Sequence, residues 1–483
     1  MATLSTKDFV VCGNGAIGMV AALHVANTFP SLRVALVGEQ ARPWSASLAA
    51  GAMIAVLGEV EDGMSDISGF HGEALALGLR SSALWRELLA RLDLKRAITA
   101  RSTIVYLPTN AGTFEQRNFA AVESAAQSRG RARGLSDSEV SDLFSRGDRD
   151  IQLAVEILDE FAIDPAVVLS ALEGRMSALG VEIIDDSVRS ISDGSVATVS
   201  LESGDALTAG RVLLAAGVNS GRLIQGNEMQ PMLQGVGTAL LANTPAKDLL
   251  PGLHSRVIRS VNRGGAQCGI HLLPRCDGQT YIGAGNYVSE PGEPETRFET
   301  VRYLLDVVEK ELIGREATYS AKGRLLLGNR PRSLDGLPLV GTLDAMPNIF
   351  VATATNRLGL TWAPAIAEWV AEWIANDDVA GIPEAWHPSR QPVPFGPRER
   401  CHTYFVESRL GNAIEHGLVE LGTPRADDLC AELGETSRRL EESLRQKFSD
   451  LGDDLPTPDV WTWLLSLDGD EPRSIARLNS RGH

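Results

Sequence analysis

Cysteine is scarce in this sequence, and its spacing argues against two kinds of site. The 483 residues include five cysteines, with no C-x-x-C pair and no cluster with histidine at the spacing of zinc ligands. We therefore expect neither a disulfide framework nor a metal site. The thiols are expected to be free in a reducing cytoplasm, and they belong to Cys12, Cys268, Cys276, Cys401 and Cys430.

Long apolar runs and positive charge are also lacking. No segment reaches the roughly 20 uninterrupted apolar residues that a membrane helix needs. The opening MATLSTKDFVVCG leads directly into an apolar strand without the parts of a secretory signal, so a cytoplasmic location is expected. Lysine and arginine total 45 against 62 aspartates and glutamates, and the net charge of −17 opposes binding to nucleic acid or anionic membranes.

Aromatic residues make up only 5% of the chain, whereas hydrophobic residues as a whole make up 44%. This composition supports a large aliphatic core and argues against a disordered chain. The length predicts two or three structural units.

The most informative stretch is VVCGNGAIGMVAALHVA, at residues 10–26. A β-rich apolar run precedes its glycines, a helical pattern follows them, and LRVALVGE at 32–39 predicts a second buried strand. This β–α–β pattern is typical of a dinucleotide-binding fold. Gly13 allows the tight turn, Gly15 lets backbone N–H groups approach a pyrophosphate, and Gly18 lets the helix pack on the strand.

Further contacts to the dinucleotide are expected from Ala16 and Ile17, which complete the glycine turn. Glu39 is expected to bind the ribose, although Gly38 occupies the position where the acid is more common. In the next stretch, SASLAAGAMIAVLGEVE, small residues would let a wide flavin ring pass close to the backbone. The expected flavin contacts there are Ala49, Ala50, Gly51, Ala52 and Met53.

Three later segments favour a flavin over a nicotinamide. Residues 162–191 predict a helix, a turn and a strand, and RVLLAAGVNSGRLI at 211–224 predicts a buried strand that ends in Ala-Gly. The third segment, at 328–374, contains NRPRSLDGLPLVG and NRLGLTWAP. Together with the N-terminal motifs, these segments resemble the FAD-dependent D-amino acid oxidase superfamily, in its glycine oxidase and sarcosine oxidase branch. The resemblance covers roughly residues 7–378.

The resemblance implies further contacts to FAD, from Val181 at the adenine, Ala216 and Gly217 near the pyrophosphate and ribitol, and Gly359, Leu360 and Thr361 at the flavin pyrimidine. A helix is expected to follow, with Pro364 in its first turn. Its positive end would stabilise negative charge on the reduced flavin. Relatives that hold FAD covalently use a cysteine that would fall near Gly328, and none stands there, so noncovalent FAD is expected.

Two arginines are the expected substrate ligands, and one of them, Arg330, is also expected to contact FAD. Arg330 and Arg357 lie in segments that approach the flavin in the resembled family, and a guanidinium binds a carboxylate through two parallel hydrogen bonds. A structural ion pair is the alternative for each. His271, in GIHLLPR, is expected either to contact the substrate or to be a packed histidine of the core.

The expected fold is mixed α/β, with a Rossmann-like FAD-binding domain, a largely antiparallel β substrate domain and a helical C-terminal extension. The extension is expected to pack on the body of the protein or on a second copy, with a lid or a carrier-protein contact as the alternative. The expected divisions are 1–90, 155–225 and 321–378 for the FAD-binding domain, 91–154 and 226–320 for the substrate domain with a surface excursion, 379–400 for a linker, and 401–483 for the extension.

These features predict an enzyme that oxidises the C–N bond of an amino acid or secondary amine, giving an imine that hydrolyses. Dioxygen or another acceptor would then reoxidise the flavin. Oxidation of a 2-hydroxy acid is the main alternative, and it would need a base, a role that His271 could fill. A tRNA-modifying flavoprotein is a further alternative that the net charge of −17 disfavours.

Overall fold

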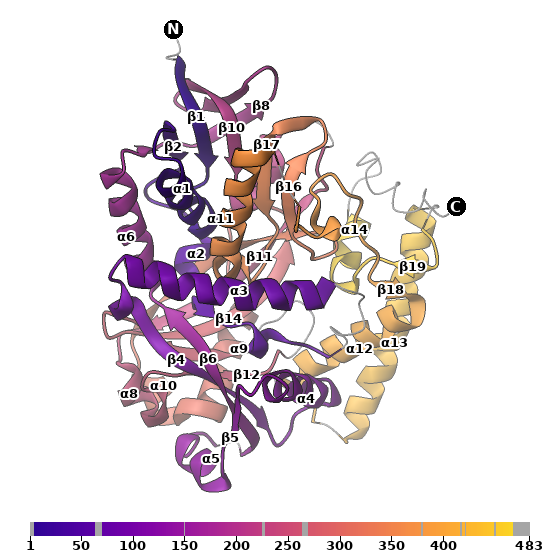
Figure 1. The fold of residues 1–483 in the computed structure, drawn as a ribbon. Helices are drawn as coiled ribbons and strands as arrows, with labels where there is room; N and C mark the ends of the chain where they lie inside the picture. The colour runs from indigo at the N-terminus through magenta and orange to yellow at the C-terminus, as the bar shows by residue number, and fades with distance from the viewer. Residues whose placement is uncertain are drawn as a thin grey trace.

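The structure, a computed structural model, describes residues 4–62, 70–148, 150–224, 228–262, 269–377, 380–415, 418–420, 422–448 and 451–466. Within these ranges the chain forms two large sheets, one above the other in Figure 1, and a helical extension along one side. No helix in the described ranges is long and apolar enough to cross a bilayer. Cys268 lies outside them, and the other cysteines are free thiols.

The first sheet contains eight strands among the described residues. They are β1 Leu4–Cys12, β2 Val34–Val37, β7 Glu182–Ile184, β8 Val188–Ser192, β9 Ala197–Leu201, β10 Ala206–Leu214, β16 Leu339–Leu343 and β17 Met346–Thr353. The main order is β16-β17-β10-β1-β2-β7, and the pairs from β17 to β7 are parallel. The strands β16, β8 and β9 add antiparallel pairs at the margins.

Successive side chains of β1 enter two different cores, as strand geometry requires. Phe9 and Val11 pack with the helices on one face, whereas Val10 and Cys12 pack with β9 and β10 on the other. Burial on both faces explains the unbroken apolar run in the sequence. The helices of the first core are α1 Ala16–Thr28, α3 Phe70–Arg91, α6 Pro165–Ala178 and α11 Gly359–Asn376.

The second sheet contains nine strands in the described ranges, in the order β15-β11-β14-β13-β12-β4-β6-β3, with β5 paired to β6. All of its pairs are antiparallel except β12 with β4. Their bounds are β3 Met53–Ile54, β4 Ile98–Pro108, β5 Ala132–Gly134, β6 Ile151–Ile163, β11 Met232–Ala242, β12 Val257–Ser260, β13 His271–Pro274, β14 Thr280–Ser289 and β15 Gly323–Ser333.

Two expectations for this half of the chain need correction. The end of segment 226–320 is helical rather than strand, because Tyr303, Leu304, Val307 and Val308 lie on one face and cover the sheet. Residues 155–163 and 323–333, expected in the FAD-binding domain, pair inside the second sheet as parts of β6 and β15. The remaining helices of the body are α2 Ala46–Ala49, α4 Thr113–Gln127, α5 Asp137–Leu143, α7 Ser220–Leu223, α8 Ala246–Leu249, α9 Phe298–Val308 and α10 Gly314–Ser320, with a π-helical turn at Glu309–Ile313.

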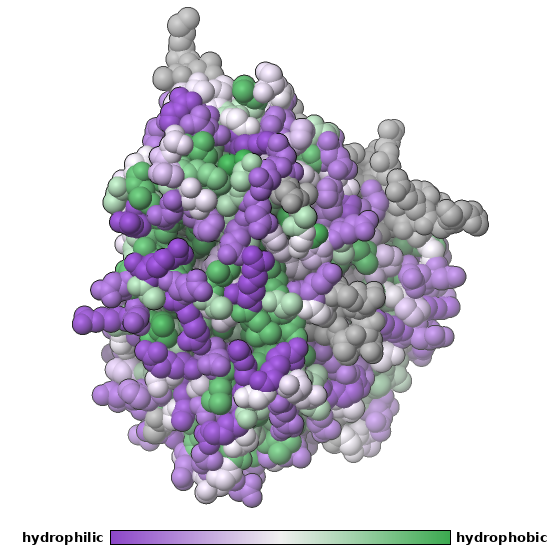
Figure 2. All heavy atoms as spheres, in the orientation of Figure 1, coloured by the Kyte–Doolittle hydropathy of each residue, from purple (hydrophilic) through white to green (hydrophobic). Residues whose placement is uncertain are grey.

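The C-terminal extension is helical, as expected, and packs on the body of the protein (Figure 1). Its core combines Phe405 and Trp461 with Leu233 and Leu334 of the body. Hydrophilic side chains cover most of the face drawn in Figure 2, with apolar atoms visible between them near its middle. The extension consists of α12 Arg398–Glu415, α13 Pro424–Lys447 and α14 Trp461–Ser466, with a small sheet of β18 Gly396–Pro397 and β19 Asp454–Leu455.

The Pro-rich segment before the extension was expected to be a linker, but its described residues are docked on the body. Trp386 is fully buried, with its ring 5.0 Å from that of Trp362 and 6.0 Å from that of Trp369. Arg390 pairs with the buried carboxylate of Asp335. A tryptophan of this size buries too much apolar surface to remain exposed on a free linker.

We predict that Trp386→Ala lowers the free energy of unfolding by about 3–5 kcal/mol, because it removes a buried indole from an aromatic cluster. Urea unfolding monitored by far-ultraviolet circular dichroism would measure the loss. Glu384→Ala, at an exposed position of the same segment, is the control and should change stability by less than about 0.5 kcal/mol. Equal stability of the two variants would show that this segment is a linker after all.

Candidate active site

The glycine turn joins β1 to α1 and brings two strand ends together. Gly13 has a φ of +119°, and a Cβ there would lie 2.3 Å from the carbonyl oxygen of Ala215, which follows β10. Only glycine permits this approach. At Gly18 a Cβ would lie 1.9 Å from the carbonyl oxygen of Gly13, so the helix packs directly against the turn. The first turn of α1 carries no acidic residue, which leaves its N-terminus suited to a phosphate group.

The position of Glu39 follows from the side chain of Asn14. A Cβ at Gly38 would lie 2.5 Å from the Cγ atom of Asn14, so the residue before the acid must be small. The Nδ2 atom of Asn14 donates a hydrogen bond of 2.8 Å to the carbonyl oxygen of Glu39. The carboxylate of Glu39 accepts a hydrogen bond from the Ser187 hydroxyl. This packing explains why the acid stands at position 39, one residue after the position where it is more common, which Gly38 occupies.

The small-residue stretch after β2 forms α2 and then β3. Ala50 lines the cavity described below, whereas Ala49, Gly51, Ala52 and Met53 do not. The Tyr281 hydroxyl donates to the carbonyl oxygen of Ala49 at 3.2 Å, and Arg275 donates to that of Ala50 at 2.5 Å. These bonds fix the stretch to the second sheet.

Of the expected residues on the other strands, Ala216 and Gly217 line this cavity and Val181 does not. Val181 is buried behind α6, where its N–H donates to the carbonyl oxygen of Met176. Residues 186–188, which follow β7 in the chain, line the cavity instead. Ala215 and Gly217 are held at the end of β10, since the Ala215 N–H donates to the carbonyl oxygen of Cys12 at 2.9 Å and the Thr353 hydroxyl donates to that of Gly217 at 2.8 Å.

The helix α11 begins at Gly359, so the expectation that Pro364 lies in its first turn is wrong: this proline is inside the helix. A proline lacks the N–H that would bond the carbonyl four residues earlier. That carbonyl belongs to Leu360, and it accepts a hydrogen bond of 2.8 Å from the indole nitrogen of Trp85 on α3. Gly359 and Leu360 line the cavity, and Thr361 is buried with its hydroxyl 3.3 Å from the carbonyl oxygen of Met53.

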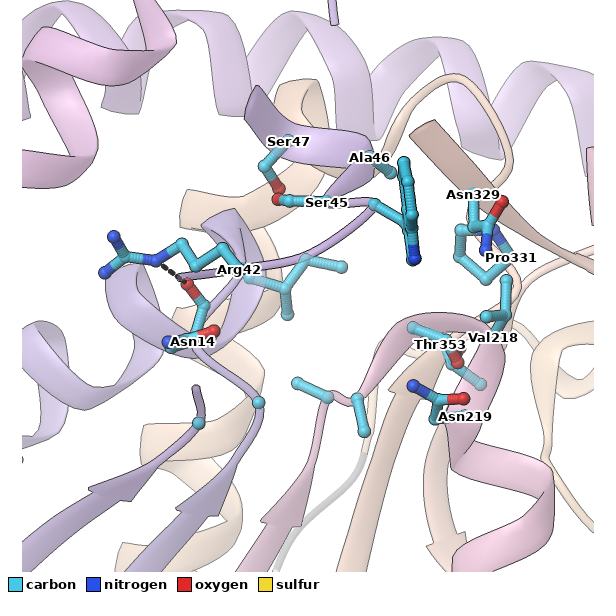
Figure 3. Close-up of a pocket in the computed structure, with 18 of the residues that line it drawn as sticks. Asn14, Arg42, Ser45, Ala46, Ser47, Val218, Asn219, Asn329, Pro331 and Thr353 are labelled. Carbon is cyan, nitrogen blue, oxygen red and sulfur yellow. Dashed lines mark hydrogen bonds between the residues drawn. The ribbon is translucent and has the colours of Figure 1, made fainter. Parts of the chain in front are cut away.

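These elements line a cavity of about 530 Å³. Figure 3 shows Asn14 and Arg42 on one side of it, and Val218, Asn219 and Thr353 on another. It runs along the glycine turn, with Glu39 in its wall, and reaches the N-terminus of α11. A volume of this order is typical of a cofactor site. The close approach at Gly13 and the N-terminus of α1, whose first turn has no acidic residue and whose Ala16 N–H donates to the Ser47 hydroxyl at 3.0 Å, both fit an FAD molecule.

Three residues that line this cavity adopt left-handed backbone conformations without being glycine. They are Arg42, Trp44 and Asn356, with φ values of 45°, 56° and 46°. Such conformations are unfavourable and cluster at functional sites. Arg42 is held there by a 3.2 Å hydrogen bond from its Nε atom to the carbonyl oxygen of Asn14 (Figure 3) and by an ion pair with Glu173.

A second cavity of about 740 Å³ adjoins the first. Residues Thr355, Asn356 and Arg357 line both. These three residues connect β17 to α11, at the end of the first cavity where Gly359 and Leu360 lie. The cavity of about 530 Å³ therefore meets the cavity of about 740 Å³ at residues 355–357.

The two expected substrate arginines both line the first cavity, and Arg357 also lines the second. Arg330 lies on β15, with its guanidinium over β11, where a Cβ at Gly237 would come within 2.8 Å of Nη2. Arg357 is held by two carboxylates, with Nη1 3.5 Å from Glu59 and Nη2 3.1 Å from Glu61. The structure thus brings both guanidinium groups to the cavity wall, and Arg357 is part of an ion-pair network.

The network also contains the fully buried Arg259, which pairs with Glu59. Burial alone would raise the pKa of Glu59, but the charges of Arg259 and Arg357 hold it at about 2. Burial raises the pKa of Glu61 above its ordinary value, although Arg357 and Asn262 act in the opposite direction. The carboxylate of Glu59 is therefore a permanent negative charge that balances the two arginines.

His271 is buried and lines neither cavity. Its Nδ1 atom is 3.0 Å from the carbonyl oxygen of Gly269, so Nδ1 carries the proton and Nε2 is the acceptor. The ring stacks on Tyr281 at 5.4 Å, and Nε2 would lie 2.8 Å from a Cβ at Gly51. Burial, and then the charge of Arg259, lower the pKa of His271 to about 3, so it is neutral at physiological pH.

Sequence reasoning missed several residues of the two cavities. Asn14 and the Asp-Ser-Val segment at 186–188 had visible signals, since the first is part of the glycine turn and the second ends the strand-turn pattern that was recognised. Arg42 and Trp44 carried no signal, because their left-handed backbone is not encoded by glycine or asparagine. In the described ranges no group of three or more metal-ligating side chains is arranged to hold an ion.

Glu160 on β6 positions the segment that carries Glu59. Its Oε1 atom accepts hydrogen bonds from three successive backbone N–H groups, those of Val56 at 2.8 Å, Leu57 at 2.8 Å and Gly58 at 2.9 Å. The side chain is buried, and burial raises its pKa. This carboxylate therefore fixes the 3₁₀ turn at Leu57–Glu59 and, through it, the ion-pair network.

We predict that Glu160→Ala lowers the free energy of unfolding by about 2–4 kcal/mol, because it leaves buried N–H groups without an acceptor. Glu160→Gln keeps an acceptor oxygen and should lose less than half as much. Thermal unfolding of the variants would measure both changes. Glu87→Ala, an exposed glutamate on α3, is the control, and a loss in Glu160→Ala no larger than in this control would contradict the positioning role.

Comparisons with known proteins agree with this geometry. A family model described as FAD dependent oxidoreductase (DAO) matches residues 8–373. Glycine oxidase of Pseudomonas aeruginosa (strain PAO1) is 25% identical over 190 residues, which are 39% of this chain and 46% of that protein. The chain thus matches about half the length of this curated relative.

Solved structures share the fold. Glycine oxidase from Geobacillus kaustophilus superposes with a TM-score of 0.66 and 19% identity, covering 80% of this chain and 99% of that one. L-amino acid deaminase from Proteus myxofaciens has a TM-score of 0.62 and 17% identity, covering 80% and 94%. L-proline dehydrogenase from P. horikoshii has a TM-score of 0.62 and 16% identity, covering 80% and 98%.

The family match spans most of the chain and contains the glycine turn, both cavity arginines and the start of α11. The expected family, fold and cofactor are therefore confirmed. The chain belongs to the DAO family of FAD-dependent oxidoreductases, and it is an FAD-dependent enzyme.

Proposed function

We propose that this enzyme oxidises the C–N bond of an amino acid or other amine at the junction of its two cavities. The observation that carries the proposal is that Thr355, Asn356 and Arg357 line both cavities. A cofactor in the first cavity and a small molecule in the second would meet at this segment. The glycine oxidase, amino acid deaminase and proline dehydrogenase named above support an amine as the substrate.

In this proposal, the FAD phosphates lie at the N-terminus of α1 beside Gly13, Gly15 and Ala16, and a ribose lies at Glu39. The adenine lies at residues 186–188, which replace Val181 in this role because they form the cavity wall. Ala216 and Gly217 lie along the middle of the cofactor, and Gly359 and Leu360 present the positive end of α11 to its flavin. We also propose that FAD is held noncovalently, since the position expected for a tethering cysteine is Gly328.

Bound FAD supplies the hydride acceptor for the reaction. The chain supplies position and charge. Arg330 is proposed to bind the carboxylate of an amino acid substrate in bidentate fashion, at the wall of the first cavity. Arg357 is already balanced by Glu59 and Glu61, so we assign it to holding the cavity junction in shape. An amine must be neutral to lose hydride, so the substrate reacts in its deprotonated form.

The 2-hydroxy acid alternative is less well supported by the geometry. It needs a base to remove the hydroxyl proton. His271 was the candidate, but a histidine with a pKa of about 3 is a weak base, and it lines neither cavity. A flavin-dependent amine oxidation needs no base from the protein when the substrate binds as the neutral amine.

The proposal predicts that an amine will bleach the visible flavin band of the purified enzyme under anaerobic conditions. Amino acids, N-methylated amines and cyclic amines would be added one at a time, with 2-hydroxy acids as the comparison series. Bleaching by hydroxy acids alone would contradict amine oxidation. Denaturing a part of the same sample should release the flavin from the polypeptide, and flavin that stays attached would contradict noncovalent binding.

For a carboxylated substrate, we predict that Arg330→Ala raises KM much more than it lowers kcat. The loss of a buried charge pair is worth about 2–5 kcal/mol, or about 30-fold to several thousand-fold in KM. Steady-state kinetics with the substrate identified by bleaching would measure it. Arg324→Ala, at an exposed position of the same strand, is the control. An unchanged KM in Arg330→Ala would remove this residue from the substrate site.

A further inference from the structure

The second cavity has two walls of different origin. The inner wall belongs to the body and includes Val56, Leu75, Arg357 and Trp362. The outer wall comes from residues 393–395 and from Tyr404, Thr457 and Asp459 of the extension. These outer residues lie beyond residue 373, where the family match ends. The solved glycine oxidase of Geobacillus kaustophilus aligns over 99% of its own length but over only 80% of this chain.

The outer wall is fixed to the body by a buried ion pair. Nη2 of Arg332, on β15, is 2.8 Å from Oδ2 of Asp459, and the two side chains are only 7% and 10% exposed. The Tyr404 hydroxyl donates to the same carboxylate oxygen at 3.3 Å. Asp459 therefore holds both the body and α12, and the wall is a built part of the cavity.

The carboxylates in this cavity are balanced within the protein. Every carboxylate among its lining residues has an arginine partner: Glu59 and Glu61 with Arg357, Asp62 with Arg117, Asp335 with Arg390, and Asp459 with Arg332. Apart from the exposed Arg129, whose guanidinium donates to the Ala125 carbonyl oxygen and the Ser128 hydroxyl, a ligand in this cavity thus meets charged side chains that are already paired. This favours an uncharged group over a second ammonium or carboxylate.

The uncharged surface of the outer wall is aromatic and aliphatic. The rings of Phe395 and Tyr404 lie 4.9 Å apart at 53°, and both side chains are half-buried where they border the cavity. Val393, Pro394, Leu337 and Pro338 continue this surface. Half-buried rings of this kind offer faces and edges to another aromatic group. The cavity volume of about 740 Å³ leaves space well beyond the needs of glycine.

We propose that the C-terminal extension forms a specificity subsite for a large, uncharged apolar group, of aromatic size, carried by the amine substrate. This inference rests on the proposed function, because it names the substrate class for the same junction of cavities. Tyr404 and Phe395 are the residues that contact this group. The extension thereby makes substrate choice in this enzyme different from that of family members that end near α11.

The first test measures binding rather than turnover. Isothermal titration calorimetry of the full-length, FAD-loaded enzyme would compare phenylacetate with acetate, two carboxylates that differ by one phenyl group. Phenylacetate should bind at least about tenfold more tightly, as expected for burial of an aromatic ring. Tyr404→Ala should remove most of this difference, Tyr404→Phe should keep it within about twofold, and Thr403→Ala, at an exposed position of the same helix, should leave it unchanged.

Phe395→Ala provides a second variant if Tyr404→Ala does not fold, and it should also reduce the preference for phenylacetate. Equal affinity of the wild-type enzyme for acetate and phenylacetate would overturn the subsite. A preference that survives both alanine variants would overturn the role of the extension.

The second test uses turnover, with racemic phenylalanine and N-benzylglycine compared with glycine and sarcosine. At least one aromatic substrate should have the higher kcat/KM in the wild-type enzyme, and Tyr404→Ala should lower that value by a larger factor than those for glycine and sarcosine. If no amine reduces the flavin while phenylacetate binding depends on Tyr404, the proposed function fails and the subsite stands. If amines are oxidised but the phenyl group has no effect, the function stands and the subsite fails.

Discussion

The close approach of two strand ends at Gly13 is the constraint on which the rest of this molecule depends. Gly13 follows β1 and Ala215 follows β10, two neighbouring parallel strands, and a Cβ at Gly13 would lie 2.3 Å from the Ala215 carbonyl oxygen. Parallel strands place their carboxyl ends at one edge of a sheet, and ligands bind outside that edge. The cofactor cavity, the N-terminus of α1 and the segment that starts α11 all converge there.

Buried charge at the junction of the cavities is handled by pairing. Arg259, Glu59, Arg357 and Glu61 form one network, and Glu160 holds the turn that carries Glu59. An unpaired charge in this position would be strongly destabilising, so the network is both rigid and locally neutral. Its effect on function is indirect: it gives the junction a fixed shape, and the arginine proposed to bind a carboxylate, Arg330, lines the first cavity.

The extension adds wall residues to a cavity that the shared fold of the family also lines. The family match ends at residue 373, and the residues after it dock through Trp386 and through the Arg332–Asp459 pair. Some of them complete the wall of the second cavity, whose other lining residues belong to the body. In the functions proposed above, the chemistry near the flavin and the selection of substrate belong to different parts of the chain, on either side of residue 373.

The sequence by itself determined the β–α–β unit, the family, FAD and the helical character of the extension, because each depends on local patterns such as GNGAIG or on a set of motifs in a given order. It also named Arg330 and Arg357, since both stand in recognised segments.

Only the tertiary structure decided what these residues contact. The pairing of Arg357 with Glu59 and Glu61, the distance of His271 from both cavities and the replacement of Val181 by residues 186–188 depend on segments that are far apart in the chain. The same holds for the docked segment around Trp386 and the internal position of Pro364, whose freed carbonyl is bonded by Trp85 from another helix. Such contacts leave no local pattern, because their free energy is gained only when the two segments meet.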